Sequence, residues 1–522
     1  MKNGSHVNFR LAYYGFDEEF LMDAFVSLMH GFGVALMPMN LLYAFVGVFI
    51  GTLIGVLPGI GPAATISMLL PITYSMSPVS AIIMLAGIFY GAMYGCSTTS
   101  ILVNIPGEAA SIVTCFDGYQ MARKGRAGPA LGISAISSFI AGTLSVVGLM
   151  FMATFLSRVA LKFGPTEYVA LICLGLVVLM NLAQGPLFKT IQMALLGFVF
   201  SYIGTDICLG TSRFTMGSVE LLSGINLIPL VMGLFGISEV FLNMEAPETR
   251  DVFQAKIGRL LPTLRDWVDS WWPMVRGTVI GFFLGILPGG GSVLSTFVSY
   301  AVEKKLSKHP EKFGTGVIEG VAAPEAANNA ATGGAFIPLF ALGIPCNVMM
   351  ALFIGALMIH GVQPGPLLIN QHPDIFWGTV ASMYIGNSML LLLNLPLLGM
   401  WVKLLKVPYH TLFPLILLFT LIGSYSTSNN TFDVYMLVFF GLLGYLLRKL
   451  EYELAPLVFA FVLGPMFENN LRQALIMSDG SFLVFLSRPI SAVCILIAAV
   501  LLLLSTVSAA RKRREKLTQG LE

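Results

Sequence analysis

Two apolar segments of the chain are interrupted by the same glycine-proline break, and no continuous helix can run through either. The first break spans Gly55 to Gly61 (GVLPGIG) and the second spans Gly285 to Gly291 (GILPGGG). Proline removes a backbone donor and clashes with the preceding turn, while glycine has no side chain to hold helical geometry. We therefore expect both stretches to unwind.

Unwound backbone is tolerated at membrane depth only where it is buried in protein or lines a water-filled cavity. A pair of broken segments in two halves of a chain is the best sequence indication of a transport site. The breaks therefore predict the floor of a substrate pocket. The alternative is a proline kink that serves helix packing alone, since glycine and proline are frequent in ordinary membrane helices.

The composition identifies an integral membrane protein. Of the 522 residues, 56% are hydrophobic and only 11% are charged. A spanning helix takes roughly 20 apolar residues, and the chain offers about a dozen candidate segments when short half-helices are counted. The apolar runs Val169 to Met180 and Ile495 to Leu504 do not alternate with polar residues, as a membrane β-barrel requires. The expected fold class is an all-α polytopic membrane protein.

The second half of the chain repeats the landmarks of the first in the same order, which indicates an internal duplication. The matched landmarks are Pro58 with Pro288, Ile105-Pro106 with Ile344-Pro345, Gly128 to Leu131 with Gly365 to Leu368, and Pro229 to Val231 with Pro456 to Val458. We therefore expect two structural repeats, each with a discontinuous helix and a helical hairpin.

The basic residues fall at different points of the two repeats. Between the second and third landmarks, repeat one carries Arg123, Lys124 and Arg126, whereas repeat two carries its lysines between the first and second landmarks, at 304–312. By the positive-inside rule, equivalent loops then lie on opposite sides of the membrane, so the repeats should be inverted. One pair opposes this interpretation, because Arg158 and Lys162 correspond to the equally basic Lys403 and Lys406.

These features divide the chain into six parts. They are an N-terminal polar, interfacial segment (1–40), transmembrane repeat one (41–244), an amphipathic linker (245–272), transmembrane repeat two (273–488), an extra C-terminal helix (489–510) and a basic tail (511–522). The basic tail predicts a cytoplasmic C-terminus. The basic clusters between apolar runs orient helices and give no indication of nucleic-acid binding.

Each repeat carries small polar residues near a second break. In repeat one Tyr94 to Ser100 precede the break at Asn104 to Gly107, and in repeat two Asn328, Asn329 and Thr332 lead into a segment that ends at Gly343. The pattern predicts a helical hairpin with a polar tip in each repeat. The half-helices that follow the breaks present unpaired amides and a positive partial charge, which favour a carboxylate or a phosphate.

The candidate substrate site consists of the residues at the breaks and the predicted hairpin tips. They are Pro58, Gly59, Gly61, Ser97, Thr98, Thr99, Asn104, Pro106, Pro288, Gly289, Gly291, Asn328, Asn329, Thr332, Pro345 and Asn347. No arginine occurs in these tips, so a Na⁺ near Gly59, Ser97, Gly289 and Asn329 could supply the positive charge that an anion needs. The alternative for each hydroxyl is a role in helix packing.

Acidic residues inside apolar segments are candidates for ion coupling. They are Glu325, Asp206 and Asp433, and Glu108 also follows the proline of the first hairpin. We favour Glu325 among them. All of them can instead be solvated groups near the ends of spans.

No catalytic or cofactor motif is recognisable. The sequence contains no HExxH, GxGD, GxSxG or GxxxxGK[ST] pattern, and its six cysteines are scattered without metal-ligand spacing. We therefore expect neither an enzyme nor an ATP-driven transporter, and no cofactor besides the coupling ion.

Several motifs resemble the large membrane subunit of the tripartite tricarboxylate transporters. They are Pro58 to Gly61, Tyr94 to Ala110 (YGCSTTSILVNIPGEAA), Pro324 to Ala331 (PEAANNAA), Gly333 to Pro345 and His360 to Pro366 (HGVQPGP), within a similarity from about Leu41 to Gly464. Cys96 and Cys346 stand where the family pattern has glycine, which leaves the substrate open.

The resemblance implies a multi-pass permease of the bacterial inner membrane. Such a permease works with a small four-helix membrane subunit and a periplasmic solute-binding protein, and it imports carboxylates such as citrate with an ion gradient of Na⁺ or H⁺. We expect alternating access in which the unit that carries the breaks moves against the outer helices, as in an elevator. A stand-alone ion-coupled organic anion transporter and an intramembrane enzyme acting on lipid-linked substrates are the alternatives.

Overall fold

The fold is almost entirely helical over the part of the chain that the structure, a computed structural model, describes. This part comprises residues 18–57, 61–182, 185–206, 208–245, 260–289, 291–404 and 409–519. Pro58 and Gly59 of the predicted site therefore lie outside the described residues. The strands β1 (Gly204–Thr205) and β2 (Ser212–Arg213) form one short antiparallel pair, with Gly204 opposite Arg213.

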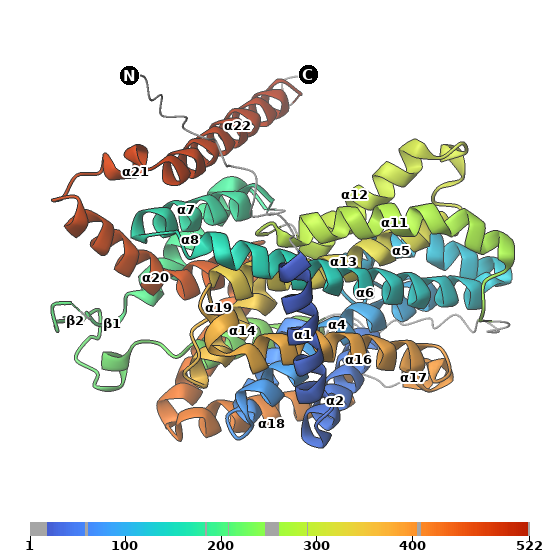
Figure 1. The fold of residues 1–522 in the computed structure, drawn as a ribbon, viewed down its shortest axis with the longest axis horizontal. Coiled ribbons are helices and arrows are strands. Elements are labelled where there is room, and N and C mark those ends of the chain that lie inside the picture. Colours follow the sequence, from blue (N-terminus) through green and yellow to red (C-terminus); the bar gives the residue numbers. More distant parts are fainter. Residues whose placement is uncertain are drawn as a thin grey trace, which may run out of the picture.

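Figure 1 shows the helices coloured along the sequence, from blue near the N-terminus to red near the C-terminus. The first half contains α1 (Glu18–Ala35), α2 (Pro38–Val56), α3 (Pro62–Thr73), α4 (Pro78–Val103), η1 (Ala109–Ser111), α5 (Ile112–Thr114), η2 (Cys115–Tyr119), η3 (Ala122–Arg126), α6 (Ala127–Ala160), α7 (Pro165–Leu182), α8 (Leu187–Ser201), η4 (Glu220–Ser223), α9 (Leu227–Val231), η5 (Met232–Ile237) and α10 (Ser238–Glu245). The second half contains α11 (Leu264–Ile286), α12 (Gly291–Leu306), η6 (Pro310–Lys312), α13 (Glu319–Leu342), α14 (Val348–Ile359), α15 (Leu368–Gln371), α16 (Pro373–Asn394), α17 (Leu398–Leu404), α18 (Tyr409–Ser428), α19 (Thr431–Lys449), α20 (Ala455–Met477), α21 (Val484–Ser487) and α22 (Pro489–Gln519).

Seven helices in the described part of the chain are long and apolar enough to cross a bilayer, and several shorter apolar helices accompany them. This confirms the all-α polytopic class. In Figure 1, α22 lies at the outer edge of the molecule, next to α7. It continues as one helix from the predicted extra helix into the basic tail.

The predicted breaks are confirmed where the structure describes them. Helix α2 ends at Val56 and α3 begins at Pro62, while α11 ends at Ile286 and α12 begins at Gly291. The second break of each half also ends a helix. Asn104 after α4 and Gly343 after α13 both adopt the left-handed conformation, with φ of 58° and 70°, which is a common way to terminate a helix.

In each half, the helical hairpin has its tip at the glycine-proline break and not, as predicted, at the second break. Helices α11 and α12 run antiparallel, with Arg276 Nε 2.5 Å from Glu303 Oε1, so the glycine-proline break itself is the hairpin tip. In repeat one the chain likewise returns to the start of α2, where Ser80 Oγ donates to Asn40 Oδ1 at 2.5 Å.

The segments predicted as polar-tipped hairpins are the continuous helices α4 and α13, so that prediction was wrong. Small hydroxyl and amide side chains do not terminate a membrane helix when they bond to backbone carbonyls or to neighbouring helices.

A stripe of glycines on each broken helix packs against a long helix, so that α2 contacts α4 and α11 contacts α13. A Cβ atom on Gly51 of α2 would lie 2.5 Å from the carbonyl oxygen of Ile88 in α4, and one on Gly281 of α11 would lie 2.2 Å from that of Ala327 in α13. The other members of the two stripes are Gly47, Gly55, Gly277 and Gly285. Spaced every fourth residue, these glycines let the two backbones touch.

The long helices of the two halves cross at the centre in opposite directions. Ser97 of α4 bonds to Glu325 of α13, while the ring centre of Phe89, earlier in α4, lies 6.2 Å from that of Phe336, later in α13. Around this crossing, α6 of the first half packs on α13 and α16 of the second half packs on α4. Helices of both halves therefore pack together at the centre of the protein.

Both basic segments lie on one face of the protein. Lys124 Nζ donates to the carbonyl oxygen of Thr315 at 2.5 Å. The Asp117 carboxylate accepts the backbone N–H groups of Gly314 and Gly316 at 3.0 and 2.7 Å and the Tyr300 hydroxyl at 2.8 Å. Although they occupy different positions in the two halves of the sequence, the basic segments come together in the fold.

Replacement of Asp117 by alanine should destabilise the protein by about 2–3 kcal/mol, because hydrogen bonds to a charged group are worth about 1.5–3 kcal/mol and the buried Asp117 carboxyl accepts several of them. The unfolding midpoint in detergent, followed by intrinsic fluorescence, measures the change. Lys124→Ala on the same face is the control, and it should stay within about 0.5 kcal/mol of the wild type. Equal midpoints for both variants would contradict this role of Asp117.

Candidate functional site

A cavity of about 790 Å³ lies where the breaks of both repeats meet. Its lining includes the predicted residues Gly61, Pro106, Gly289, Gly291 and Asn347. The helices α3, α12 and α14 begin at this cavity, so their amide ends face it. This is the arrangement in which helix N-termini bind anions.

The two breaks of each half touch one another beside the cavity. In repeat two, the Gly289 N–H donates to the carbonyl oxygen of Cys346 at 2.8 Å. In repeat one, Glu108 Oε2 lies 3.4 Å from the point that a Cβ on Gly61 would occupy. Pro288 precedes the lining residue Gly289 and Pro345 lies two positions before Asn347, but neither proline is part of the lining.

The opposite wall of the cavity is charged, which the sequence did not predict. It carries Glu239 of α10, Arg448 of α19 and Glu453. Arg448 Nη1 donates to Glu239 Oε2, and its guanidinium lies 5.8 Å from the centre of the Phe235 ring. Glu453 Oε1 accepts the Gly185 N–H at 2.9 Å.

A sequence signal for this wall existed, since Glu239 and Arg448 are charged residues within or at the end of apolar helices. Their meeting could not be predicted, because the two residues are 209 positions apart. The hairpin tips lack arginine as expected, yet an arginine reaches the cavity from another helix.

The predicted hydroxyl and amide residues of α4 and α13 do not line this cavity. They form a buried polar cluster around Glu325, where Ser97 Oγ donates to Oε2 and Thr114 Oγ1 to Oε1, both at 2.5 Å. Asn329 Nδ2 donates to Ser138 Oγ of α6 at 2.7 Å. The cluster therefore joins α4, α5, α6 and α13.

The other predicted residues of these helices also bond within the helix packing. Thr99 donates to the carbonyl oxygen of Val56 at 2.6 Å, Thr332 to that of Asn328 at 3.1 Å, and Asn328 to that of Met93 at 3.2 Å. Thr98 is buried in α4, and Asn104 is exposed where α4 ends.

The predicted Na⁺ positions are not brought together. Ser97 and Asn329 belong to the buried polar cluster, Gly289 lies at the cavity, and Gly59 is outside the described residues. Over the described ranges, no three His, Cys, Asp or Glu side chains are grouped so that they could hold a metal ion.

Asp206 and Asp433 are both remote from the 790 Å³ cavity. Asp433, at the start of α19, accepts hydrogen bonds from Ser428 Oγ and, at 3.3 Å, from Asn226 Nδ2. Asp206 lies beside a second cavity of about 650 Å³, which the loop between α8 and α9 covers.

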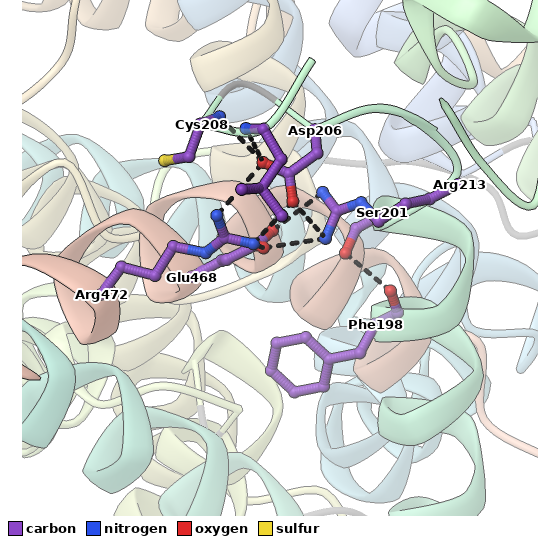
Figure 2. A network of polar contacts seen from close by, with 8 residues as sticks. Phe198, Ser201, Asp206, Cys208, Arg213, Glu468 and Arg472 are labelled. Atoms are coloured by element: carbon purple, nitrogen blue, oxygen red, sulfur yellow. Dashed lines mark hydrogen bonds and ion pairs between the residues drawn. The ribbon is translucent and has the colours of Figure 1, made fainter. Parts of the chain in front are cut away.

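Two arginines hold Asp206 in place. Arg472 Nη2 lies 2.7 Å from Asp206 Oδ2, and Arg213 Nη1 lies 3.7 Å from the same oxygen. Figure 2 shows both guanidinium groups turned toward the carboxylates of Asp206 and Glu468. Hydrogen bonds from Arg472 and from the Leu209 N–H lower the pKa of Asp206 below its usual range. This arrangement fixes a loop and leaves the carboxylate ionised.

The pH dependence of this loop follows from the direction of that pKa shift. A lowered pKa in the folded state adds stability at pH values above the ordinary aspartate pKa of about 3.9, and the gain is lost only as pH falls through the lower folded value. The loop at residues 202–226 should therefore resist proteolysis equally from pH 8 to pH 4. In Arg472→Gln, cleavage should be several-fold faster at pH 8 and should accelerate further near pH 4.

Limited proteolysis followed by mass spectrometry of the fragments measures this effect. The control is Arg265→Gln, which breaks an exposed pair with Asp269 and should change nothing measurable, since such pairs contribute little. A pH-independent cleavage rate in Arg472→Gln would contradict the role given to Arg472.

Comparison with known proteins shows which family the sequence matches. Residues 41–459 match the model of the family described as "Tripartite tricarboxylate transporter TctA family". A protein of Agrobacterium vitis described as an uncharacterized 52.8 kDa protein in the TAR-I ttuC′ 3′ region is 50% identical over 496 residues, which are 95% of this chain and 99% of the relative. A second one, from the TAR-II ttuC′ 3′ region of the same organism, is 51% identical over 236 residues, 45% of this chain and 98% of the relative. No solved structure matches the chain.

Proposed function

The chain belongs to the TctA family of tripartite tricarboxylate transporters, and from this premise we propose that it is the large permease subunit of a binding-protein-dependent importer. Its cargo would be a tricarboxylate or a related carboxylate, and an ion gradient of Na⁺ or H⁺ would drive the uptake. Its partners would be a small four-helix membrane subunit and a periplasmic solute-binding protein. It would lie in the bacterial inner membrane with the C-terminus in the cytoplasm.

The cavity between the breaks is the observation that carries this proposal. Its volume of about 790 Å³ is within the range of sites for small organic ligands. One wall presents the amide ends of half-helices, and the other presents the guanidinium of Arg448. Both groups favour carboxylates, because a guanidinium offers paired donors and a helix start offers a positive partial charge.

The charges of the cavity support ion coupling. Its described lining has three carboxyl groups, Glu108, Glu239 and Glu453, against one guanidinium. An anion that enters such a site needs further positive charge, which a co-transported cation or proton would supply. Glu325 remains a candidate for a coupling ion in the polar cluster, where hydroxyl oxygens surround a carboxyl group.

The opposite directions of the two central helices and the shared basic face support inverted repeats. In this arrangement, the unit that carries the breaks would move against the outer helices and expose the cavity alternately to each side.

Uptake of radiolabelled citrate and succinate tests the proposal. The full chain is reconstituted in vesicles with the small membrane subunit and the binding protein, and the Na⁺ gradient and the pH gradient are varied separately. We expect uptake that needs the binding protein and collapses with one of the two gradients. Uptake without the binding protein would favour a stand-alone transporter, and the absence of any carboxylate uptake would contradict the proposal.

A further inference from the structure

Glu108 occupies a distinctive position in the cavity. Its Oε2 lies against Gly61, where α3 begins, and its backbone N–H bonds to Ser111 Oγ at 3.4 Å. Over the described residues it forms no ion pair, whereas Glu239 is paired with Arg448, and Glu453 accepts a backbone N–H. The Glu108 carboxyl accepts backbone N–H groups of its own turn, but over the described residues no cation forms an ion pair with it.

The internal repeat provides a natural comparison for Glu108. When Ile105-Pro106 is matched with Ile344-Pro345, Glu108 corresponds to Asn347, and both residues line the cavity. Asn347 begins α14, and its Oδ1 accepts the Met350 N–H at 2.9 Å. In repeat two, an uncharged amide at this position is thus sufficient to cap the helix that follows. The carboxyl group in the other half adds the ability to bind a proton.

Several ionisable groups act on Glu108. Across the cavity are the carboxylates of Glu239 and Glu453 and the guanidinium of Arg448, and Cys96 of α4 lies behind it. Glu325 of α13 lies beyond Cys96, and the part of α12 that lines the cavity carries no ionisable side chain. Arg448 and the start of α3 favour the ionised form in the empty cavity, whereas an arriving substrate carboxylate would oppose it.

We propose that Glu108 binds the proton that is co-transported with each carboxylate. This inference rests on the proposed transport function and adds the identity of the coupling ion and its binding residue. The substrate carboxylate competes with Glu239 for Arg448, and two carboxylates then share one guanidinium. A proton on Glu108 restores the charge balance, and when the substrate leaves on the other side, Glu108 releases the proton there.

The test measures proton flow together with citrate uptake. The full chain with both partner subunits is reconstituted in vesicles that contain a pH-sensitive dye, and radiolabelled citrate is supplied at pH 8, where citrate is fully ionised. The variants are Glu108→Gln, which keeps the shape and one acceptor oxygen, and Glu451→Gln, whose exposed carboxyl lies outside the lining of the cavity. Unfolding midpoints of all three proteins show whether each is folded.

We expect the number of protons that enter with each citrate to fall by about one in Glu108→Gln, since one carboxyl binds one proton. The exposed control variant Glu451→Gln should keep the wild-type proton-to-citrate ratio. Equal proton-to-citrate ratios in the wild type and Glu108→Gln, or uptake driven by Na⁺ without proton flow, would overturn the inference and leave the proposed function intact. If the wild type takes up no carboxylate, the proposed function itself fails.

Discussion

Replacement of Arg448 by glutamine should lower carboxylate uptake at subsaturating substrate by about 30-fold or more. A hydrogen bond to a charged group is worth about 1.5–3 kcal/mol, and each 1.4 kcal/mol is a factor of ten. Arg448 is the only guanidinium or ammonium in the described lining of the cavity. Without Arg448, only the helix N-termini of the described lining would bind the substrate carboxylate. Uptake of radiolabelled citrate in vesicles, measured over a range of concentrations, gives the change.

Two further variants separate substrate binding from folding. Arg448→Gln leaves Glu239 without its partner, which could disturb the packing of α10 against α19. The double variant Arg448→Gln with Glu239→Gln removes that carboxylate, so it should fold like the wild type and still fail to transport. Lys449→Gln, at the next position on α19, pairs with Glu245 away from the cavity and should retain uptake. Wild-type uptake by the double variant would contradict a substrate role for Arg448.

Replacement of Gly281 by alanine should lower the free energy of unfolding by about 2–3 kcal/mol, and leucine at this position should prevent assembly. A Cβ atom would lie 2.2 Å from the carbonyl oxygen of Ala327. Because that oxygen belongs to the backbone of α13, a helix has to shift to relieve the contact. Forced overpacking of this kind typically costs 1–3 kcal/mol. Unfolding midpoints and size-exclusion profiles in detergent measure both effects.

Gly33 of α1 is the matched control for Gly281. It is also a helical glycine, but a Cβ atom there would meet nothing within 4 Å. Gly33→Ala should therefore stabilise the protein slightly, because alanine favours the helix by about 1 kcal/mol over glycine. The two substitutions are chemically identical and should have opposite signs. If both raise or both lower the midpoint, close helix packing does not explain the glycine stripes.

The sequence predicts the breaks well, because proline and glycine act on their own backbone. The ends of α2 and α11 and the left-handed residue Asn104 follow from such local chemistry. The positions of the hairpins were predicted wrongly. Ser97 and Asn329 would look the same in sequence whether they faced a cavity or another helix, and they face another helix.

The charged wall of the site could not be predicted from the sequence for a different reason. Glu239 and Arg448 come from helices of different halves, and only the fold brings them opposite the breaks. Local sequence patterns therefore predicted the side of the cavity that the breaks form, whereas the charged side depends on tertiary packing. The same limit applies to Asp206, whose partners Arg213 and Arg472 were not recognisable as its partners in the sequence.

The carboxyl of Glu325 between α4 and α13 has a mechanical consequence. Its hydrogen bonds fix the spacing of these two helices, and the glycine stripes attach α2 to the first and α11 to the second. The four helices are thus held together as one packed unit by hydrogen bonds and direct backbone contacts. In the proposed transport cycle, α10 and α19, which carry the charged wall of the cavity, would be displaced relative to this unit.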